Sequence, residues 1–484
     1  MTELGEPVDR VFADVAERAH VPGIAYGVIH RGELVHTGGV GTLHARRDER
    51  PDADSVFRIA SMTKSFTAAT ILSLRDEGVL RLDERVAAYA PELADWRGPT
   101  ADSPELTLRH LMTMSGGLPE DDAWADRHLA DDPATMDALF AAGGSFAHAP
   151  GTAFEYANLG WAMLGRVVEH ATGSRVQDLV RERLLGPLGM TCTGWTVDEL
   201  PAGVRIATGW RWLDDEGFVA EPEPLGDGGL APMGGLWSTV RDIARWVAFQ
   251  LDAHPPRADP DDGPVSRATR REQQTTARSD ELRTVTPRPG GPDRVIANGY
   301  AMGLFVRMDQ RIGTHVGHSG GLPGFGSHMR WIPDRDFGLV ALGNARYAPM
   351  GDAIVEVFEV LEDLGTLPAK REVPVTPVLA EAFARLTRLL DDWDEAEADA
   401  LFADNVFQDD DRERRRRQAE RMRAQHGPLV PAGPVTATSR LGGRCDLAGG
   451  HVRLTVQLSA YALPLIQGYE LEPVPTETAE PDDV

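Results

Sequence analysis

Residues 23–342 begin and end with segments that have the sequence pattern of β-strands. Between these segments lies a long stretch in which apolar and polar residues do not alternate regularly. Residues 23–29 and 33–37 have the pattern of short strands, and Arg31-Gly32 between them predicts a hairpin turn. The pattern returns at residues 300–308, 315–318, 328–332 and 338–342. Strands of this kind pair into a sheet, and the apolar face of the sheet is buried by other elements. We therefore expect one antiparallel sheet whose strands come from both ends of this region and which is flanked by helices.

The intervening residues 80–230 predict a mostly helical insertion, and residues 252–297, rich in Pro, Asp and Arg, predict a long surface excursion. The expected fold class is therefore α/β (α+β). At 484 residues the chain exceeds one ordinary domain. We predict a first domain over residues 1–366, a linker over 367–377 and a small α+β module over 378–484. That module resembles an NTF2-like module, with a lipocalin-like barrel as the alternative.

The net charge of −26 and the isoelectric point near 4.9 predict repulsion from anionic partners, so we expect no nucleic acid and no membrane surface as a partner. No basic segment followed by an apolar run begins the chain, and no stretch approaches a membrane span, so we expect a soluble, cytoplasmic protein. Cys192 and Cys445 are far apart, which fits a reducing compartment. Because no metal-ligand cluster is evident, neither a metal nor a cofactor is predicted.

Ser61-Met62-Thr63-Lys64 is notable because lysine is rare in this chain. Of the 49 basic residues only Lys64 and Lys370 are lysine, which leaves 49 − 2 = 47 arginines. Residues three apart share a face of a helix, so the Ser61 hydroxyl and the Lys64 amine can meet. Lysine, unlike arginine, loses its proton when it is desolvated, so this pair has the layout of a nucleophile with its own base. The alternative is a capping serine and a surface lysine.

Two further segments offer groups that would complete such a site. Tyr156-Ala157-Asn158 is the only Tyr-x-Asn in the chain, and it offers a phenol for proton relay and an amide to hold a substrate. The alternative for Tyr156 is a loop tyrosine over the core. His318-Ser319-Gly320-Gly321 ends in glycines that suit the close approach of a ligand. His318 is a candidate for proton transfer, although a lone histidine is more often structural, and the amides of Ser61 and Gly321 are oxyanion candidates.

Together these three motifs, in this order and at these separations, resemble the class C β-lactamases among the penicillin-recognising serine hydrolases. The likeness extends through residues 106–119, 150–173 and 234–238 and covers about residues 8–362. It implies an acyl-enzyme mechanism without a cofactor, in which Ser61 attacks a carbonyl and Lys64, assisted by Tyr156, is the base. It also implies that Asn158 holds the acyl amide and that Ser319, Gly320 and Gly321 border the substrate.

The chain departs from those β-lactamases at His318-Ser319-Gly320, where they carry Lys-Thr-Gly. A permanent cation that recognises a carboxylate is replaced by a titrating imidazole. Relatives with His at this place resemble esterases, D-amino-acid peptidases and acyl transferases. We therefore expect a serine hydrolase that cleaves a small-molecule or peptide ester or amide, with a homodimer as the candidate assembly. The alternatives are a penicillin-binding-protein-type thioesterase, cyclase or acyltransferase that uses an amine acceptor, and a non-catalytic binding protein on the same fold.

Overall fold

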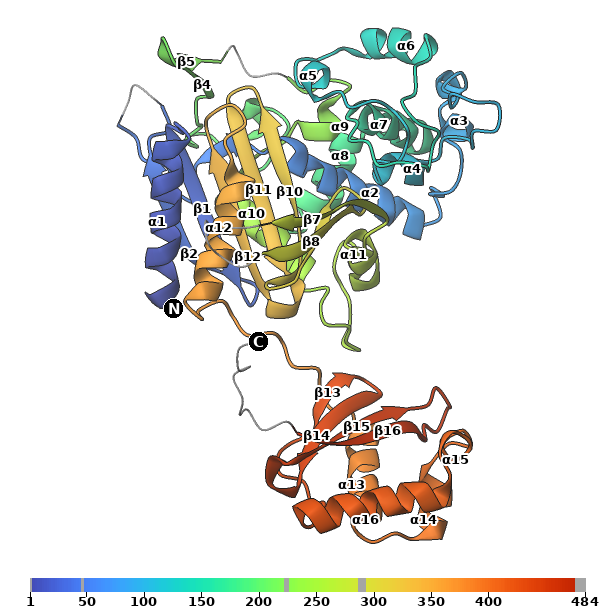
Figure 1. Ribbon diagram of the computed structural model, residues 1–484. Coiled ribbons are helices and arrows are strands. Elements are labelled where there is room, and N and C mark those ends of the chain that lie inside the picture. The colour runs from blue at the N-terminus through green and yellow to red at the C-terminus, as the bar shows by residue number, and fades with distance from the viewer. Residues whose placement is uncertain (1, 45–47, 222–225, 286–292, 475–484) are drawn as a thin grey trace, which may run out of the picture. The chain divides into compact units, whose positions relative to one another are not determined.

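The computed structural model describes residues 2–44, 48–221, 226–285 and 293–474, and it divides into two compact units, Met1–Lys370 and Arg371–Val484. The first unit is built on an eight-stranded antiparallel sheet of order β2-β1-β12-β11-β10-β9-β8-β7 (Figure 1). Because β1 pairs with both β2 and β12, the predicted sheet from two chain ends is confirmed. The strands are β1 (Gly23–His30), β2 (Glu33–Gly41), β7 (Arg278–Val285), β8 (Arg294–Tyr300), β9 (Phe305–Asp309), β10 (Gly313–Leu322), β11 (Phe325–Ile332) and β12 (Phe337–Gly343).

Helices cover both faces of this sheet. α1 (Thr2–Arg18) and α12 (Met350–Asp363) pack on one face, and α10 (Val240–Leu251) packs on the other. The period-two alternation along β1 divides its side chains accordingly: Ile24 and Val28 belong to the core under α1 and α12, whereas Ala25 belongs to the core under α10. Both cores exclude water from apolar side chains, which is the main source of their stability.

The hairpin turn lies where the sequence predicts it, whereas the predicted excursion over residues 252–297 is wrong in part. Arg31 and Gly32 both have positive φ, of 54° and 78°, as a tight two-residue turn requires. Within the supposed excursion, α11 (Arg267–Gln273) precedes β7 and β8, which extend the main sheet. β7 is almost wholly exposed and carries charged residues of both signs, so its sequence lacks the apolar pattern that identifies a half-buried strand.

The insertion is mostly helical, as predicted. Its helices are α3 (Val86–Tyr89), α4 (Leu108–Met112), α5 (Asp122–Ala125), α6 (Pro133–Ala141), α7 (Leu159–Thr172) and α8 (Val176–Val180); α2 (Thr63–Asp76) precedes it and α9 (Ala231–Gly234) follows it. Two short strand pairs accompany them: β3 (Val56–Arg58) with β6 (Trp237–Thr239), and β4 (Trp210–Leu213) with β5 (Gly217–Ala220). β3 leads directly into the turn that carries Ser61.

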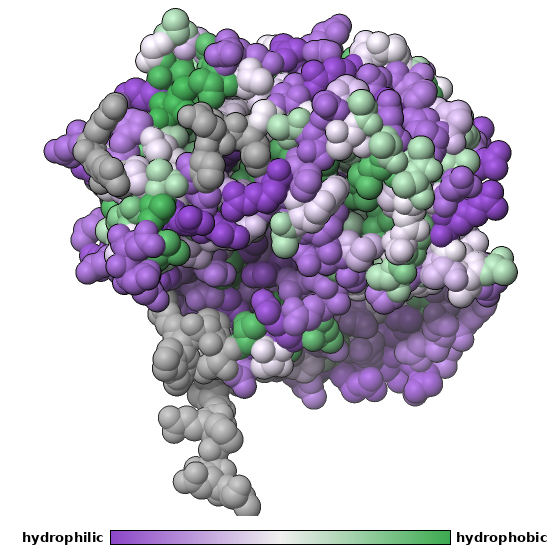
Figure 2. Space-filling view, turned by 90° about the horizontal axis from the view of Figure 1, so that it is seen from above, coloured by the Kyte–Doolittle hydropathy of each residue, from purple (hydrophilic) through white to green (hydrophobic). Residues whose placement is uncertain are grey.

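The second unit has helices first and strands afterwards, around a core of its own. Its family, NTF2-like or lipocalin-like, stays a prediction. Within the described ranges, no helix combines the length and the apolarity needed to cross a bilayer. The face in Figure 2 is mostly hydrophilic. The elements are α13 (Pro377–Asp391), α14 (Glu395–Leu401), α15 (Val406–Asp409), α16 (Arg412–His426), β13 (Thr436–Ser439), β14 (Gly442–Leu447), β15 (Val452–Leu458) and β16 (Ile466–Pro473), and the four strands pair in sequence order.

Candidate active site

Ser61 lies in a strained turn between β3 and α2. The Ile59 amide donates to the Leu236 carbonyl at 3.0 Å and ends the strand pairing. Ala60 then adopts a left-handed backbone with φ of 47°, a conformation that a non-glycine residue rarely takes. A short 3₁₀ turn, η1 (Ala60–Met62), comes before α2, so the helix begins two residues later than the predicted start at Ser61. Strain of this kind is concentrated at functional sites.

Lys64 is fully buried, and its amine makes three short contacts. Its Nζ lies 2.8 Å from the Ser61 Oγ, 2.7 Å from the Asn158 Oδ1 and 2.8 Å from the Met233 carbonyl oxygen. Burial disfavours the charged amine and lowers the pKa of Lys64 to about 7. At neutral pH a substantial fraction of Lys64 is therefore the free amine, which is the form that can act as a base.

The partners of Lys64 decide which way its lone pair points. A neutral amine has two hydrogens and one lone pair. The amide oxygen of Asn158 and the carbonyl oxygen of Met233 can only accept, so each takes one hydrogen. The lone pair is left for the third contact, the hydroxyl of Ser61. The neutral site thus has the Ser61 proton directed at the amine that would remove it.

Two carboxylates accept hydrogen bonds from the side-chain amide of Asn158 and fix its position. Its Nδ2 donates to the Asp121 Oδ1 at 3.1 Å and to the Asp122 Oδ1 at 2.6 Å, and its side chain is fully buried. The backbone amides of Asn158 and Leu159 donate to the same Asp121 carboxylate and so fix the start of α7. Both amide hydrogens of Asn158 are used by these carboxylates and its oxygen accepts from Lys64, so Asn158 positions Lys64 here; the substrate-holding role stays a prediction.

Tyr156 lies against both members of the pair. Its ring centre is 5.0 Å from the Lys64 Nζ, and its hydroxyl hydrogen-bonds with Ser61. Burial, together with the negative charge of Asp122, raises the pKa of Tyr156 well above its usual value. Tyr156 is therefore a neutral phenol that can pass a proton on, and of the two groups beside Ser61 only Lys64 has a pKa near neutrality.

His318 is neutral and has no free ring nitrogen, which corrects the expectation of a titrating imidazole. Its Nδ1 lies 2.6 Å from the Ser319 carbonyl oxygen, so that nitrogen carries the hydrogen and donates. Its Nε2 then accepts from the Tyr300 hydroxyl at 3.1 Å. Burial, aided by the charge of Lys64, lowers the pKa of His318 to about 3. These hydrogen bonds fix the His318 side chain on β10 beside the site. Because both ring nitrogens are used, the contacts do not fit the proton-transfer role predicted for His318.

Ser319 is oriented by a buried pair that the sequence did not indicate. Arg330 can only donate, and its Nε donates to the His328 Nε2 at 2.9 Å. His328 therefore carries its hydrogen on Nδ1, which donates to the Ser319 Oγ at 2.7 Å. The hydroxyl hydrogen of Ser319 is left to point elsewhere, and Ser319 lines the cleft. This leaves a hydrogen-bond donor for a bound substrate.

Gly320 and Gly321 let β10 pass very close to the nucleophile. A Cβ on Gly320 would lie 2.2 Å from the Ile59 carbonyl oxygen, and one on Gly321 would lie 2.3 Å from the Tyr347 ring. The cleft has a volume of about 510 Å³ and brings together Ser61, Tyr156, His318, Ser319, Gly320 and Gly321 with Asp122, Asp280, Asp352 and Tyr347. Ser61 and Gly321 thus face one space, as an oxyanion hole requires.

Three carboxylates near the base, those of Asp121, Asp122 and Asp126, were not identified from the sequence. Each raises the pKa of Lys64 and opposes the effect of burial. Asp126 is buried, which raises its own pKa to about 6, and it accepts from the Tyr347 hydroxyl. Tyr347, in a left-handed backbone with φ of 50°, lines the cleft beside Gly321. The sequence around these aspartates has no pattern that indicates such roles, because the roles arise only when the start of α7 comes into contact with the residues at α5.

The rate constant kcat/KM is expected to rise with pH around an apparent pKa near 7 and to level off above it, because Lys64 acts as a base only when it is neutral. Asp122→Asn removes the carboxylate that raises the pKa of Lys64 most, so the rise in kcat/KM should move to lower pH. Hydrolysis of an activated ester over a pH series measures both curves. Asp178→Asn, at an exposed ion pair with Arg181, is the control. A shift to higher pH in Asp122→Asn would contradict the assignment of Lys64.

Comparisons with known proteins show which family and which proteins this chain is similar to. A family model described as Beta-lactamase matches residues 8–362. The protein Flp of Staphylococcus aureus is 26% identical over 349 residues, which cover 71% of this chain and 64% of Flp. Penicillin-binding protein 4 of Amycolatopsis lactamdurans is 33% identical over 238 residues, which cover 48% of this chain and 60% of that protein. The chain thus spans less than two thirds of the length of these relatives.

Among solved structures, the octameric penicillin-binding protein homologue from Pyrococcus abyssi superposes with a TM-score of 0.63. The match covers 98% of this chain and 91% of that chain at 21% identity, so it shows the fold alone.

Proposed function

The chain belongs to the β-lactamase family, and from that premise we propose that it is a serine hydrolase that cleaves a small ester or amide through an acyl-enzyme on Ser61. The observation that carries the proposal is the contact of 2.8 Å between the Ser61 Oγ and the buried amine of Lys64, the pKa of which is lowered to about 7. A serine becomes nucleophilic when an adjacent base takes its proton, and Lys64 is placed to do so.

The proposed reaction has two halves. In the first, the Ser61 Oγ attacks the substrate carbonyl carbon while its proton passes to Lys64, and the amides of Ser61 and Gly321 bind the oxyanion. The tetrahedral intermediate then expels the leaving alcohol or amine, which takes the proton from Lys64, directly or through the phenol of Tyr156. In the second half, water attacks the acyl carbon, gives its proton to the neutral Lys64 and releases the acid, and Ser61 recovers its proton.

Neutral His318 argues against a β-lactam substrate. The resemblance assigns this position to a permanent cation that recognises a carboxylate, whereas the pKa of His318 is lowered to about 3. The carboxylates of Asp122, Asp280 and Asp352 line the cleft and would repel such a group, although Arg307 lines a smaller hollow beside it. We therefore propose an esterase or D-aminoacyl peptidase activity and expect turnover of nitrocefin to be far slower than that of a phenyl ester.

The same three carboxylates favour a second candidate function. An amine that enters the cleft as a cation would be concentrated there and could replace water as the acyl acceptor once it loses its proton. The activity would then be that of a penicillin-binding-protein-type thioesterase, cyclase or acyltransferase. A peptidyl thioester with a free amine separates the two functions, because hydrolysis gives the linear acid and aminolysis gives a cyclic or transferred amide. Product masses measured with and without an added amine decide between them.

The substrate panel that tests the main proposal contains p-nitrophenyl esters, D- and L-aminoacyl anilides and nitrocefin. Turnover of an ester or anilide that disappears in Ser61→Ala supports the proposal, whereas a rate unchanged by that substitution would refute it. The octameric state is a property of the Pyrococcus abyssi homologue. We propose that this chain also self-associates, at least as a homodimer, and light scattering of the purified protein measures the assembly directly.

A further inference from the structure

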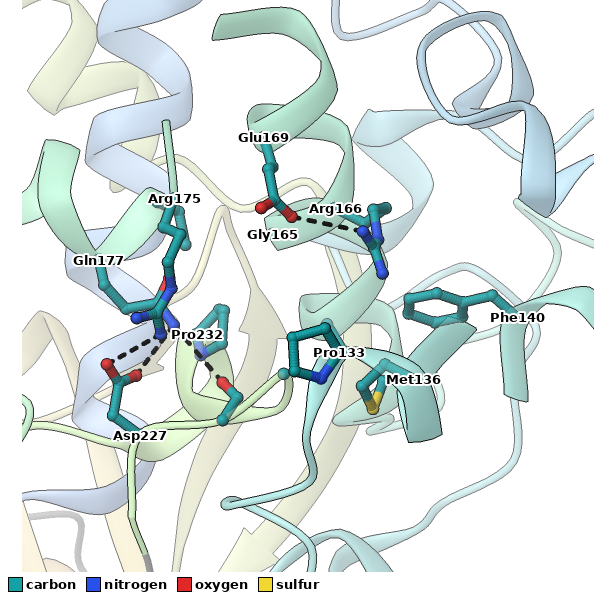
Figure 3. A pocket seen from close by; sticks show the side chains of 14 residues that line it. Pro133, Met136, Phe140, Gly165, Arg166, Glu169, Arg175, Gln177, Asp227 and Pro232 are labelled. Atoms are coloured by element: carbon teal, nitrogen blue, oxygen red, sulfur yellow. Dashed lines mark hydrogen bonds and ion pairs between the residues drawn. The ribbon is translucent and has the colours of Figure 1, made fainter. Parts of the chain in front are cut away.

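Apart from the catalytic cleft and the smaller hollow beside it, two hollows of the first unit differ in how their charged groups are paired. In the hollow of Figure 3, Arg175 lies 2.8 Å from Asp227, and Gln177 donates to the same carboxylate at 2.9 Å. In the same view Arg166 is joined to Glu169, at 3.5 Å. These polar groups are partnered within the protein, so the hollow in Figure 3 does not need a ligand to complete it.

The second hollow, of about 460 Å³ beside β3 and β6, contains a buried arginine on which the carboxylate of Asp227 acts only from beyond contact distance. Arg58 is 3% exposed, its guanidinium carbon lies 4.6 Å from the Trp237 ring centre, and its Nη1 donates to the Gly235 carbonyl oxygen at 3.3 Å. Over the described ranges no carboxylate comes within 4.0 Å of this guanidinium. A buried cation in this state carries a desolvation cost that an anionic ligand would offset through charge-assisted hydrogen bonds.

The same hollow contains a buried carboxylate whose oxygens lack hydrogen bonds. The side chain of Glu221 is 3% exposed, and neither carboxylate oxygen has a hydrogen-bond partner among the described residues. The Arg127 Nη1, at 3.5 Å, forms an ion pair that is too long for a good hydrogen bond. Buried carboxylates are normally bonded, so Glu221 is a second polar group here that a ligand would complete.

Apolar side chains form the rest of the wall. Trp237 and Phe325 meet edge to face with ring centres 5.6 Å apart, and Leu322 lies beside them. A hollow of this size with apolar walls and a few convergent polar groups has the character of a small-molecule site. We propose that it binds a small zwitterionic amino compound, a free amino acid or a dipeptide with an apolar side chain, whose carboxylate contacts Arg58 and whose ammonium contacts Glu221.

This site is separate from the catalytic cleft but adjoins its machinery. The residues that line the two spaces do not overlap. Arg58 lies three residues before Ser61 in the sequence, and Leu322 follows Gly321 directly. A ligand here would therefore contact both segments that carry the proposed nucleophile and the proposed oxyanion amide. The proposal does not rest on the proposed function, because it concerns binding alone.

Five probes with one phenyl ring each test the two charges separately. Phenylalanine and glycylphenylalanine carry both charges, 3-phenylpropionate only the carboxylate, 2-phenylethylamine only the ammonium, and 3-phenylpropanol neither. Calorimetry on the full chain should find phenylalanine or glycylphenylalanine the tightest, with at least about a tenfold loss in affinity for each charge removed. Phenylalanine and glycylphenylalanine differ in the distance between their ammonium and carboxylate groups. The one that binds more tightly therefore indicates the spacing of the charges that the site accepts. Prior labelling of Ser61 should leave this binding intact, which separates it from binding in the cleft.

Two substitutions place the binding in this hollow. Arg58→Gln should erase the difference in affinity between phenylalanine and 2-phenylethylamine, and Glu221→Gln should erase the difference between phenylalanine and 3-phenylpropionate. Arg10→Gln, at an exposed ion pair of α1, is the matched control, and Glu221→Gln serves alone if Arg58→Gln fails to fold. Failure of all probes to bind at about 10 mM, equal binding of 3-phenylpropanol, or unchanged affinities in folded variants would overturn the proposal.

Discussion

Replacing Lys64 with arginine is expected to lower kcat/KM for an activated ester at least about 10³-fold. Arginine keeps its proton at any accessible pH, so it cannot take the proton of Ser61. Its planar guanidinium also does not match the three contacts that the Lys64 amine makes with Ser61, Asn158 and the Met233 carbonyl. Steady-state hydrolysis of p-nitrophenyl acetate by the purified variant measures the loss.

The chain provides a matched control, because Lys370 is its other lysine. Lys370→Arg makes the same chemical change away from the cleft and should leave kcat/KM unchanged. Thermal melts of both variants separate a lost base from a lost fold. A folded Lys64→Arg that keeps activity within about tenfold of the parent would show that another group is the base.

Gly320→Ala is expected to destabilise the first unit by about 2–3 kcal/mol and to remove most activity. The added Cβ would lie 2.2 Å from the Ile59 carbonyl oxygen and 3.0 Å from the Cβ of Ala60, so β10 and the turn that carries Ser61 must separate. A backbone atom cannot turn aside as the end of a side chain can. Chemical denaturation followed by tryptophan fluorescence measures the stability, and ester hydrolysis measures the activity.

Gly468→Ala is the control for that prediction. Gly468 also lies in a strand, β16, but a Cβ there would meet no atom within 4 Å. Its replacement should change stability by less than about 1 kcal/mol. Equal effects of the two substitutions would mean that the loss in Gly320→Ala comes from strand propensity alone and not from contact with the nucleophile turn.

The Ser61 and Lys64 pair was predictable because helical spacing alone brings residues three apart together. The sheet was predictable where a strand is a continuous apolar run, as in β1, and was missed at β7, whose exposed and charged residues form no such run. Asp121 and Asp126 could not be identified because their roles depend on how distant loops fold behind Asn158. The same limit applied to His318. This imidazole is neutral because it is buried and because its Nε2 accepts from the Tyr300 hydroxyl, and neither fact can be read from the spacing of residues in the sequence.

The central claim is that the hydroxyl of Ser61 is made nucleophilic by the amine of Lys64. Intact-mass analysis after treatment with a fluorophosphonate tests it most directly, because attack by the Ser61 oxygen forms an O–P bond and releases fluoride. We expect a single adduct on the native chain and on Ser439→Ala, a change at an exposed serine, and none on Ser61→Ala. An unmodified native protein, or an equal adduct on Ser61→Ala, would contradict the claim.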